Sequence, residues 1–475
     1  METKTSPFFI PELLTVRGGT PVYGSVDVSG AKNAILGLMA AALLTDEPVI
    51  LNNVPYISDV LEMGHIMKEL GVDVRYAPRR KILFLHARTI TSNVISEKAV
   101  HFRASYYLWG SLLARFVHTG EFDSLKVLMP GGCSFGGKRR TDFHEQLIKS
   151  VFNAEIVEEP YNGRHYLCFN LPKGKSCSGN PVYATFKASH GATYHWMLSV
   201  AGSSEIKMMY NSSMEPEISN LLMMLQQMGL GLSGNERTGL IYDGKNRGLL
   251  HGGTFYVIPD RMEAATYALL AVGTKGEIQI DNINFENCRP WFSQLYNMFE
   301  SGVYYSPDKT QLNLNFRNRA PFEGVIMQMS PFPGMETDLQ QIWTPILGQA
   351  QSGSFLADLI WPGRIAHLEQ MEKFGLRSEA EQREVRVSQE ISDKVLLVKI
   401  KPSQYHAADV EGMDLRGTMA LIIMAAMTEG KSKISTPSYA LRGYPNLIEN
   451  LQQLGIGITS SAKGTRIEVL PEYVG

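Results

Sequence analysis

Cysteine is scarce in this chain. Four cysteines stand among 475 residues, and no two of them have the close spacing of paired zinc ligands. So few cysteines in so long a chain exclude a fold that is held together by disulfide bonds. We therefore expect no metal centre, and a cysteine with a chemical role would act as a reactive thiol.

An excess of charge of one sign is also missing. The 45 lysines and arginines are balanced by 47 aspartates and glutamates, whereas binding along a phosphate backbone needs a basic excess. Nucleic acid is therefore not an expected partner. A local basic pocket is still compatible with this balance.

Long apolar runs are absent. The longest, at 34–44 and 419–427, extend over about ten residues, which is half of what spans a bilayer. The beginning of the chain mixes acidic, basic and proline residues and lacks the basic-then-apolar order of a signal peptide. We expect a cytoplasmic protein without membrane contact.

What is present is the composition of a globular protein. Hydrophobic residues make up 44% of the chain and charged residues 19%, which allows a sizeable core. At about 150 residues per domain, the length predicts two or three domains.

A helix-ending turn recurs along the chain. It has an apolar residue, then glycine or asparagine, then a second apolar residue, which is typical of a left-handed helix C-cap. The 384 residues from Gly71 to Gly455 make five steps, so the period is about 77 residues. The six turn residues are Gly71, Asn153, Gly229, Gly302, Gly375 and Gly455.

Each repeat has the same order of predicted elements. In the first, an apolar helix at 33–44 precedes a strand at 49–51 and an amphipathic helix at 58–70. Such a unit cannot bury its helices alone, so three repeats form a domain of about 230 residues. The sequence predicts an α/β fold of two similar domains with six repeats, and the cleft between them is the expected ligand site.

Charged residues open the first helix of every repeat. Five of these six residues are cations, although a helix N-terminus favours negative charge. The arrangement is explained if an anion binds the side chains together with the free backbone amides. The six residues are Lys32, Arg103, Lys187, Arg261, Asp338 and Arg416.

Seven short motifs then identify a resemblance that extends over nearly the whole chain. In order they are Val28-Ser29-Gly30-Ala31-Lys32-Asn33-Ala34, Arg103-Ala104-Ser105, Pro130-Gly131-Gly132-Cys133, Pro259-Asp260-Arg261, Thr337-Asp338-Leu339-Gln340, Asp414-Leu415-Arg416 and Arg442-Gly443-Tyr444. Together they resemble the motifs of the UDP-N-acetylglucosamine enolpyruvyl transferases, which share the fold of EPSP synthase. The resemblance implies two inverse α/β barrels, each of three repeats. It implies domains at 32–258, with the Cys133 loop, and at 1–31 plus 259–475, with the active site in the cleft between them.

The resemblance also implies the reaction and its donor site. The enolpyruvyl group of phosphoenolpyruvate is transferred to a sugar hydroxyl by addition, which forms a tetrahedral ketal. Elimination from this ketal then releases phosphate. No cofactor is implied. Asp338 is implied as the base and Cys133 as the acid, with Lys32 as a further catalytic residue. The phosphoenolpyruvate-binding residues implied are Lys32, Arg103, Arg139, Arg416 and Arg442.

The acceptor implied by the resemblance is a uridine nucleotide, most closely UDP-N-acetylglucosamine. The implied nucleotide- and sugar-binding residues are Asn33, Arg139, Arg140, Thr141, Asp142, Lys187, Ser189, His190, Gly191, Thr337, Asp338 and Arg364. The chain departs from the family pattern on this side, with Arg139-Arg140-Thr141-Asp142 in place of Arg-Pro-Val-Asp, Met335-Glu336 before Thr337, and Pro362-Gly363-Arg364 in place of Glu-Asn-Arg. An acceptor such as UMP, in nucleoside-antibiotic biosynthesis, is therefore the alternative.

Parts of the sequence are compatible with two further functions. Gly132, Gly137 and Lys138 match most of a P-loop, but Arg139 stands where the magnesium-binding hydroxyl belongs. A catalytically silent paralogue that binds a nucleotide as a regulator is the alternative from another class. In all these cases we expect a monomer or a weak homo-oligomer.

Overall fold

The computed structural model describes residues 8–101, 103–128, 142–161, 163–172, 179–184, 188–235, 239–299, 302–386 and 392–475. The chain forms two compact units. The inserted unit consists of the described residues of 30–258 together with Leu470–Gly475, and the flanking unit of those of 8–29 and 259–469.

The end of the chain belongs to the inserted unit, whereas the sequence-based boundary assigned it to the other domain. The ring of Tyr473 stacks on Phe84 with the ring centroids 5.2 Å apart. Arg80 donates a hydrogen bond to the carbonyl of Gly475 at 2.9 Å. These contacts cannot be predicted from a local sequence pattern, because about 390 residues separate the two partners.

Each unit contains three four-stranded sheets that share one pairing pattern. In every sheet the first two strands are parallel, and the remaining two pairs are antiparallel. The sheets of the inserted unit join β15 (Gly253–Tyr256), β4 (Val49–Asn52), β6 (Ile82–His86) and β5 (Asp73–Ala77); β7 (Val94–Ile95), β8 (Ser124–Val127), β10 (Arg164–Asn170) and β9 (Glu155–Tyr161); and β11 (Val182–Ala184), β12 (Lys207–Tyr210), β14 (Gly239–Tyr242) and β13 (Leu232–Asn235).

The flanking unit repeats this arrangement. Its sheets join β3 (Tyr23–Asp27), β16 (Glu277–Asp281), β18 (Leu312–Asn315) and β17 (Val303–Tyr305); β19 (Ile326–Met329), β20 (Ser354–Asp358), β22 (Ser392–Lys401) and β21 (Arg377–Arg386); and β23 (Asp409–Glu411), β24 (Gly430–Ser435), β2 (Leu13–Gly18) and β25 (Gly457–Ser460). A small sheet pairs β1 (Phe8–Pro11) with β26 (Gly464–Ile467). The predicted α/β fold with six repeats is confirmed.

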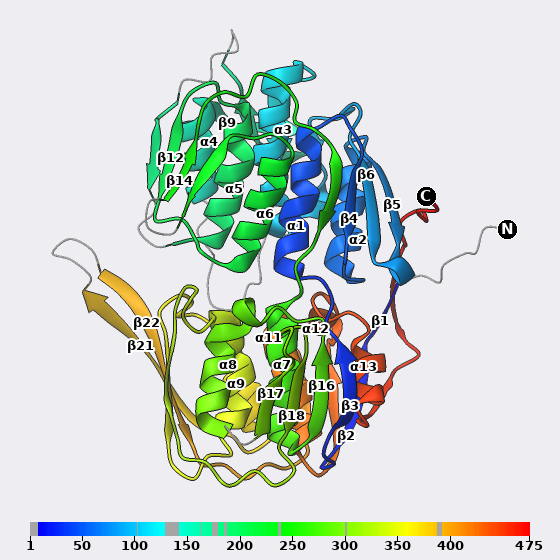
Figure 1. Cartoon of the computed structure of the whole chain (residues 1–475), viewed down its shortest axis with the longest axis vertical. Coiled ribbons are helices and arrows are strands. Elements are labelled where there is room, and N and C mark those ends of the chain that lie inside the picture. Colours follow the sequence, from blue (N-terminus) through cyan, green and yellow to red (C-terminus); the bar gives the residue numbers. More distant parts are fainter. Residues whose placement is uncertain are drawn as a thin grey trace. The chain divides into compact units, whose positions relative to one another are not determined.

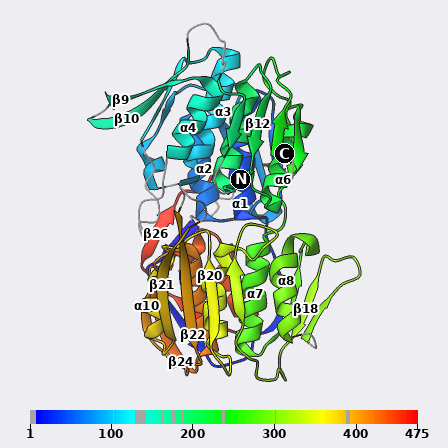
Figure 2. The ribbon, with the colours of Figure 1, turned by 90° about the vertical axis from the view of Figure 1, so that its left-hand side faces the viewer.

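Three apolar helices form the centre of each unit (Figures 1 and 2). They are α1 (Lys32–Ala41), α3 (Tyr106–Thr119) and α5 (His190–Ser199) in the inserted unit, and α7 (Arg261–Thr274), α9 (Gln340–Leu347) and α11 (Leu415–Met427) in the flanking unit. Every residue of α7 is buried. A helix that is apolar on all sides belongs in a core, and the sheets and remaining helices cover these three.

The second helices of the repeats are shorter or amphipathic. They are α2 (Ser58–Glu69), α4 (Asp142–Phe152), α6 (Pro216–Gln227), α8 (Phe285–Phe299), α10 (Ala366–Glu372), and α12 (Ser438–Leu441) with α13 (Leu447–Gln453). The turns that end them confirm the repeat. Gly71, Gly229, Gly375, Gly455 and Asn153 all have positive φ, and at Gly302 a Cβ would lie 2.5 Å from the carbonyl oxygen of Asn315.

The chain passes from one unit into the other through two paired segments. Asp260 donates its backbone N–H to the carbonyl of Ser29 at 2.8 Å, and Ala31 donates to Ile258 at 2.7 Å. The inserted unit therefore lies in the sequence between β3 and α7, and β15 at its end completes the sheet that β4 began. Strands that are far apart in the sequence therefore pair in three of the sheets, β15 with β4, β16 with β3, and β24 with β2.

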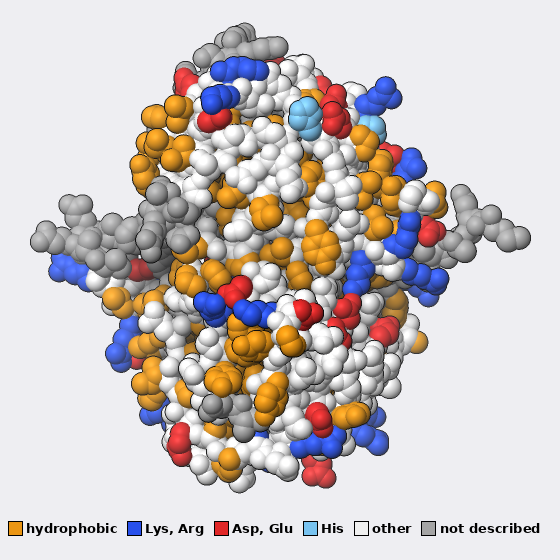
Figure 3. Space-filling view, in the orientation of Figure 1, with side chains coloured by type: hydrophobic (Ala, Val, Ile, Leu, Met, Phe, Trp, Pro, Cys, Tyr) orange, Lys and Arg blue, Asp and Glu red, His pale blue; other side chains and the backbone are white. Residues whose placement is uncertain are grey.

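The surface carries charges of both signs. On the face shown in Figure 3, acidic and basic side chains are interspersed and do not gather in one extended patch. Strand β21 lies at the edge of its sheet, is exposed at nine of its ten residues and is rich in charge, which opposes pairing with other chains. In the part of the chain that the structure describes, no helix has the length and apolar character needed to cross a membrane.

Candidate active site

Carboxylates mark the helix starts of the flanking unit. The Asp260 carboxylate caps α7 by accepting from the backbone N–H groups of Met262 and Glu263 at 2.8 and 3.0 Å. Asp414 caps α11 by accepting from the N–H of Gly417 at 2.8 Å. Asp338 lies in the 3₁₀ turn Thr337–Leu339 that leads into α9. The local sequence accounts for this, because Asp is among the best N-cap residues.

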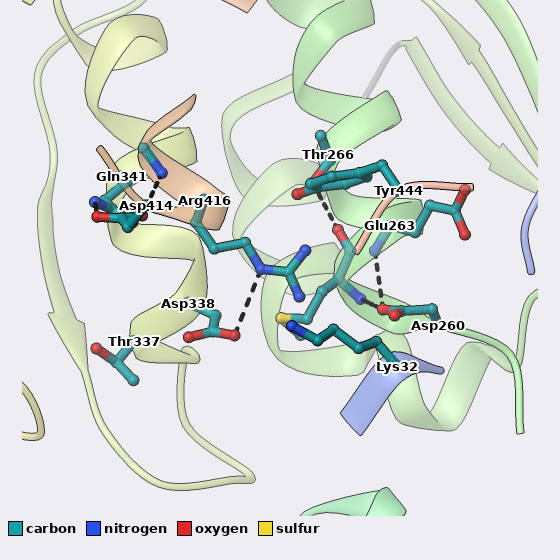
Figure 4. Close-up of polar contacts among 12 residues, drawn as sticks. Lys32, Asp260, Glu263, Thr266, Thr337, Asp338, Gln341, Asp414, Arg416 and Tyr444 are labelled. Atoms are coloured by element: carbon teal, nitrogen blue, oxygen red, sulfur yellow. Dashed lines mark hydrogen bonds and ion pairs between the residues drawn. The ribbon is translucent and has the colours of Figure 1, made fainter. Parts of the chain in front are cut away.

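Asp338 contacts two arginines, Arg364 and Arg416. Figure 4 shows the contact with Arg416. Nη1 of Arg364 lies 3.0 Å from its Oδ1, and Nε of Arg416 lies 3.5 Å from its Oδ2. Arg364 also donates to the carbonyl of Thr337 at 2.6 Å. The Asp338 side chain is 29% exposed, so a carboxylate of fixed orientation is open to a ligand.

Arg416 is a buried cation, and not all of its N–H groups donate a hydrogen bond to the described residues. Its guanidinium lies 5.2 Å from the ring centre of Tyr444, whose hydroxyl is held by Thr266 at 2.9 Å. Burial acts to lower the pKa of Arg416, but Tyr444, Asp338 and Asp260 outweigh it and raise that pKa. Among the described residues Nη1 has no hydrogen-bond partner. A charged N–H that is buried without an acceptor favours an anionic ligand.

Arg261 forms an ion pair with an acidic side chain of the protein. This corrects the expectation that every cation at the start of a repeat's first helix binds an anionic ligand. The guanidinium of Arg261 is paired with Glu336, and both side chains are more than nine-tenths buried. The guanidinium also lies 5.2 Å from the ring centre of Phe332. Breaking such a buried pair would leave an isolated charge, so Arg261 has a structural role.

A buried polar cluster lies behind Asp414. Gln341 donates from Nε2 to the Asp414 carboxylate at 2.8 Å and lies 3.3 Å from Nδ1 of His367. Burial, opposed by Asp414 and assisted by Arg364, lowers the pKa of His367 to about 4. This cluster was not predicted from the sequence. The two adjacent glutamines Gln340 and Gln341, at the start of the otherwise apolar helix α9, were a usable signal.

In the inserted unit Lys32 and Asn33 occupy the first positions of α1. Nζ of Lys32 lies 2.9 Å from the Asp59 carboxylate, and Asp59 is 2% exposed. Asp59 was not identified from the sequence, since an acid in the first turn of a helix is common. The ion pair with Asp59 orients the ammonium group of Lys32.

The start of α5 carries three predicted nucleotide-binding residues. Ser189 is the N-cap, and its Oγ accepts from the N–H of Ala192 at 3.3 Å. His190 and Gly191 follow it in the first turn, and the ring of His190 packs edge-on against Tyr194. No acidic residue lies in this turn, which leaves a positive helix end.

Several predicted residues lie outside the described part of the chain. These are Cys133, Arg139, Arg140, Thr141 and Lys187, and for Arg103 and Asp142 the backbone alone is described, at the starts of the 3₁₀ turn Arg103–Ser105 and of α4. Arg442 directly follows α12, and Tyr444, two residues later, contacts Arg416. Cys168 and Cys288 are buried. Burial raises the pKa of the Cys168 thiol, which makes it unreactive.

A cavity of about 620 Å³ lies at the C-terminal ends of α7 and α11. The residues that line it include Thr20, Lys275 and Arg317. Helix C-termini carry partial negative charge, so this position is unfavourable for an anion. The residues predicted for the donor do not line it.

The comparisons with known proteins agree with this fold. Residues 16–451 match the family EPSP synthase (3-phosphoshikimate 1-carboxyvinyltransferase). The chain is 31% identical to UDP-N-acetylglucosamine 1-carboxyvinyltransferase 1 of Streptococcus agalactiae over 446 residues, which are 94% of this chain and 98% of the relative. It is 32% identical to UDP-N-acetylglucosamine 1-carboxyvinyltransferase 2 of Streptococcus pyogenes over 447 residues, with the same coverage.

Solved structures are similar as well. The enolpyruvyl transferase NikO from Streptomyces tendae superposes with a TM-score of 0.78 at 18% identity, covering 95% of this chain and 99% of that one. EPSP synthase from Acinetobacter baumannii gives a TM-score of 0.65 at 13% identity, covering 94% and 99%. The P-loop alternative concerned 132–138, outside the described residues, and the family match leaves it without support. From the family match and the relatives at 31–32% identity it follows that this chain belongs to the EPSP synthase family of enolpyruvyl transferases.

Proposed function

We propose that this enzyme transfers the enolpyruvyl group of phosphoenolpyruvate to the 3-hydroxyl of UDP-N-acetylglucosamine and releases phosphate. The observation that carries the proposal is the Asp338 carboxylate between Arg364 and Arg416, where Nη1 of the buried Arg416 lacks a partner among the described residues. This arrangement places a base, the Asp338 carboxylate, beside guanidinium N–H groups that donate hydrogen bonds to an anion. The names of the relatives at 31–32% identity support the acceptor.

In the addition step the acceptor oxygen bonds to C2 of phosphoenolpyruvate. Asp338 accepts the hydroxyl proton, and Cys133 gives a proton to the methylene carbon, which becomes a methyl group in a tetrahedral ketal. In the elimination step the bond from C2 to the phosphate oxygen breaks and phosphate leaves. The methyl group then returns a proton to the Cys133 thiolate, and the new double bond forms.

The arginines do more than bind the donor. While the site holds no substrate, Arg364 and Arg416 stabilise the Asp338 carboxylate and make it a weak base. The carboxylate and phosphate of phosphoenolpyruvate compete for the same guanidinium groups, together with Lys32, Arg103, Arg139 and Arg442. Donor binding therefore increases the basicity of Asp338 at the moment when a base is needed.

The acceptor binds through its phosphates at the start of α5. Lys187, Ser189, His190 and Gly191 contact the diphosphate, and Asn33, Arg139, Arg140, Thr141, Asp142, Thr337 and Arg364 contact the uridine and the sugar. The helix end without an acidic residue supports this assignment. We also propose a cytoplasmic monomer or weak homo-oligomer.

UMP or a related uridine nucleotide is the second candidate acceptor. Glu336 directly precedes Thr337, at a place where the sequence departs from the family pattern, and it forms a buried ion pair with Arg261. This changed surrounding of Thr337 favours an acceptor other than the usual sugar nucleotide.

A phosphate-release assay tests these assignments. Phosphoenolpyruvate is combined separately with UDP-N-acetylglucosamine, UMP, UDP and shikimate 3-phosphate, and release is expected with UDP-N-acetylglucosamine. Release with UMP alone would replace the acceptor. Nucleotide binding without any release would contradict the transfer and favour the silent regulatory paralogue.

A further inference from the structure

Asp358 is a buried acid outside the proposed catalytic and binding set. It is the last residue of β20 in the flanking unit, and it is 1% exposed. Burial of a carboxylate is unfavourable unless other groups satisfy its oxygens. Both oxygens of Asp358 accept hydrogen bonds, and the donors come from two segments that are far apart in the sequence.

One oxygen shapes the loop that follows β20. Oδ1 of Asp358 accepts from the backbone N–H groups of Ile360 and Trp361 at 2.8 and 2.9 Å. Such contacts with the next residues of the chain make a tight turn. The loop continues to Arg364, whose backbone N–H donates to the carbonyl of Trp361 at 3.2 Å. The Asp358 carboxylate therefore sets the path of the segment that carries Arg364.

The other oxygen binds a different segment. Oδ2 of Asp358 accepts from the hydroxyl of Thr337 at 2.6 Å. Thr337 is the first residue of the 3₁₀ turn that contains Asp338. The turn after a strand needs only one side-chain oxygen, so the turn does not account for this second contact. The contact ties the segment of the proposed base to the loop of Arg364.

Arg364 completes a ring of contacts around Asp338. Its Nη1 donates to the carbonyl of Thr337 at 2.6 Å and to Oδ1 of Asp338 at 3.0 Å. Asp358 thus holds Thr337 directly, and it holds Arg364 through the loop. Proton transfer needs a base in a fixed orientation, and a small displacement of that base is costly for the reaction.

We infer that Asp358 is a positioning residue that keeps Asp338 and Arg364 together by binding the Thr337 hydroxyl and the loop at 360–361. The inference rests on the proposed function for the role of Asp338 as the base. Asp358 does not touch the reacting atoms in this role. Without its two oxygens the turn and the loop would move independently, and Arg364 would leave the Asp338 carboxylate.

The variants Asp358→Asn and Asp358→Leu test the inference. Asn keeps an oxygen for the two backbone N–H groups, and its amide N–H can donate to the Thr337 hydroxyl. Leu has a similar shape and no polar atom. Asp308→Leu is the matched control, because Asp308 of the same unit also accepts from a nearby hydroxyl, that of Ser306, and from the backbone N–H of Thr310.

A further variant is available if Asp358→Leu does not fold. Asp358→Ser retains a single oxygen on a shorter side chain, which can make the turn but does not reach Thr337. Asp358→Ser is therefore expected to release the turn of Asp338 while the loop at 359–364 stays in place.

The first measurement needs no substrate. Hydrogen–deuterium exchange is followed at 336–341 and 359–364, and Asp358→Leu is expected to accelerate both segments about tenfold through the loss of buried hydrogen bonds. Asp358→Asn and Asp308→Leu are expected to leave both unchanged. Unchanged exchange at 336–341 in Asp358→Leu or Asp358→Ser, or acceleration of both segments in Asp308→Leu, would overturn the inference.

Tryptophan fluorescence provides a second reading of the loop. Trp361 is partly exposed, whereas the other four tryptophans of the chain are fully buried. Quenching by acrylamide therefore reports mainly on Trp361. It is expected to increase in Asp358→Leu and to stay unchanged in Asp358→Asn, and equal quenching in all these proteins would contradict a role of Asp358 in holding the loop.

The last measurement uses the proposed reaction. The pH profile of kcat/KM reports the free enzyme, in which Arg364 stabilises the ionised form of Asp338. Asp358→Leu is expected to move the acidic midpoint of this profile upward by about one pH unit, because Arg364 leaves the carboxylate. Asp358→Asn is expected to keep the wild-type midpoint.

Two outcomes of this measurement decide different questions. A lower melting temperature of Asp358→Leu with an unchanged pH midpoint would make Asp358 a purely structural residue and overturn the inference. If the wild-type enzyme releases no phosphate with any nucleotide, the proposed function fails. The exchange measurement then decides alone whether Asp358 ties the two segments together.

Discussion

The two units use the same helices and sheets but differ at the helix starts. In the flanking unit Asp260 and Asp414 cap α7 and α11, and Asp338 lies in the turn before α9. In the inserted unit no acidic residue lies in the first turn of α1, α3 or α5. Ala31 and Ser105 provide no side-chain cap, whereas Ser189 provides a neutral one.

This difference divides the chemistry. A carboxylate at a helix N-terminus neutralises the partial positive charge there and attracts arginines, as Asp338 does. A helix start without a carboxylate leaves its N–H groups to an external anion such as a phosphate. We therefore propose that one repeated fold yields a unit suited to base chemistry and to anion binding by arginines, and a unit suited to the phosphates of the nucleotide.

The largest expected effect concerns the carboxylates of the flanking unit. Asp338→Asn keeps the shape of the side chain and removes the base, so kcat for phosphate release should fall about a thousandfold. Asp409→Asn is the control, because Asp409 is an exposed acid of the same unit that pairs with Lys433. Equal activity of the two variants would show that Asp338 is not the base.

The next effect is the pH dependence of stability at His367. Burial lowers the pKa of His367 from 6.5 to about 4 in the folded protein. Between these values the unfolded chain binds a proton that the folded protein does not, so the free energy of unfolding falls as the pH decreases from 6.5 to 4. A difference of this size corresponds to about 3 kcal/mol, each pKa unit being about 1.4 kcal/mol.

Denaturant unfolding at several pH values measures this effect. His367→Gln removes the titrating ring and should give a flatter profile over the same range. If the profiles of the two proteins run parallel, acid sensitivity arises elsewhere.

A third test separates donor from acceptor. Arg416→Met removes the buried cation, and because a hydrogen bond to a charged group contributes about 1.5–3 kcal/mol, the KM for phosphoenolpyruvate should rise about 10- to 100-fold. The Kd for the nucleotide should change little, since its phosphates are assigned to the start of α5 in the inserted unit. Arg319→Met serves as control, because Arg319 is a half-buried arginine of the same unit that donates to the carbonyl of Val272. A matching loss of nucleotide affinity in Arg416→Met would contradict the division of labour.

The smallest effect is obtained by giving α5 the character of the other unit. Ser189→Asp places a carboxylate at the N-cap, which should stabilise the helix by about 0.5 kcal/mol and weaken nucleotide binding about tenfold through repulsion of the phosphates. Ser189→Asn provides a cap of the same shape without charge. Calorimetry of nucleotide binding and thermal unfolding measure both quantities, and unchanged affinity in Ser189→Asp would place the phosphates elsewhere.

The sequence by itself determined the repeat and the family. The turn residues from Gly71 to Gly455 and the apolar helices between them are local patterns, because a left-handed cap and a buried helix are each specified by adjacent residues. Lys32, Asp338 and Arg416 could be selected in the same way, since each stands at a helix start.

The tertiary structure alone decided the partners of these residues. Asp59 pairs with Lys32, Glu336 with Arg261, and Arg364 with Asp338, over separations of 26 to 75 residues. It likewise decided that β15 completes the sheet of β4 and that Thr337 meets Asp358. A local sequence pattern predicts only that a side chain is buried or charged. Its hydrogen-bond or ion-pair partner depends on which strands and helices become neighbours when the chain folds.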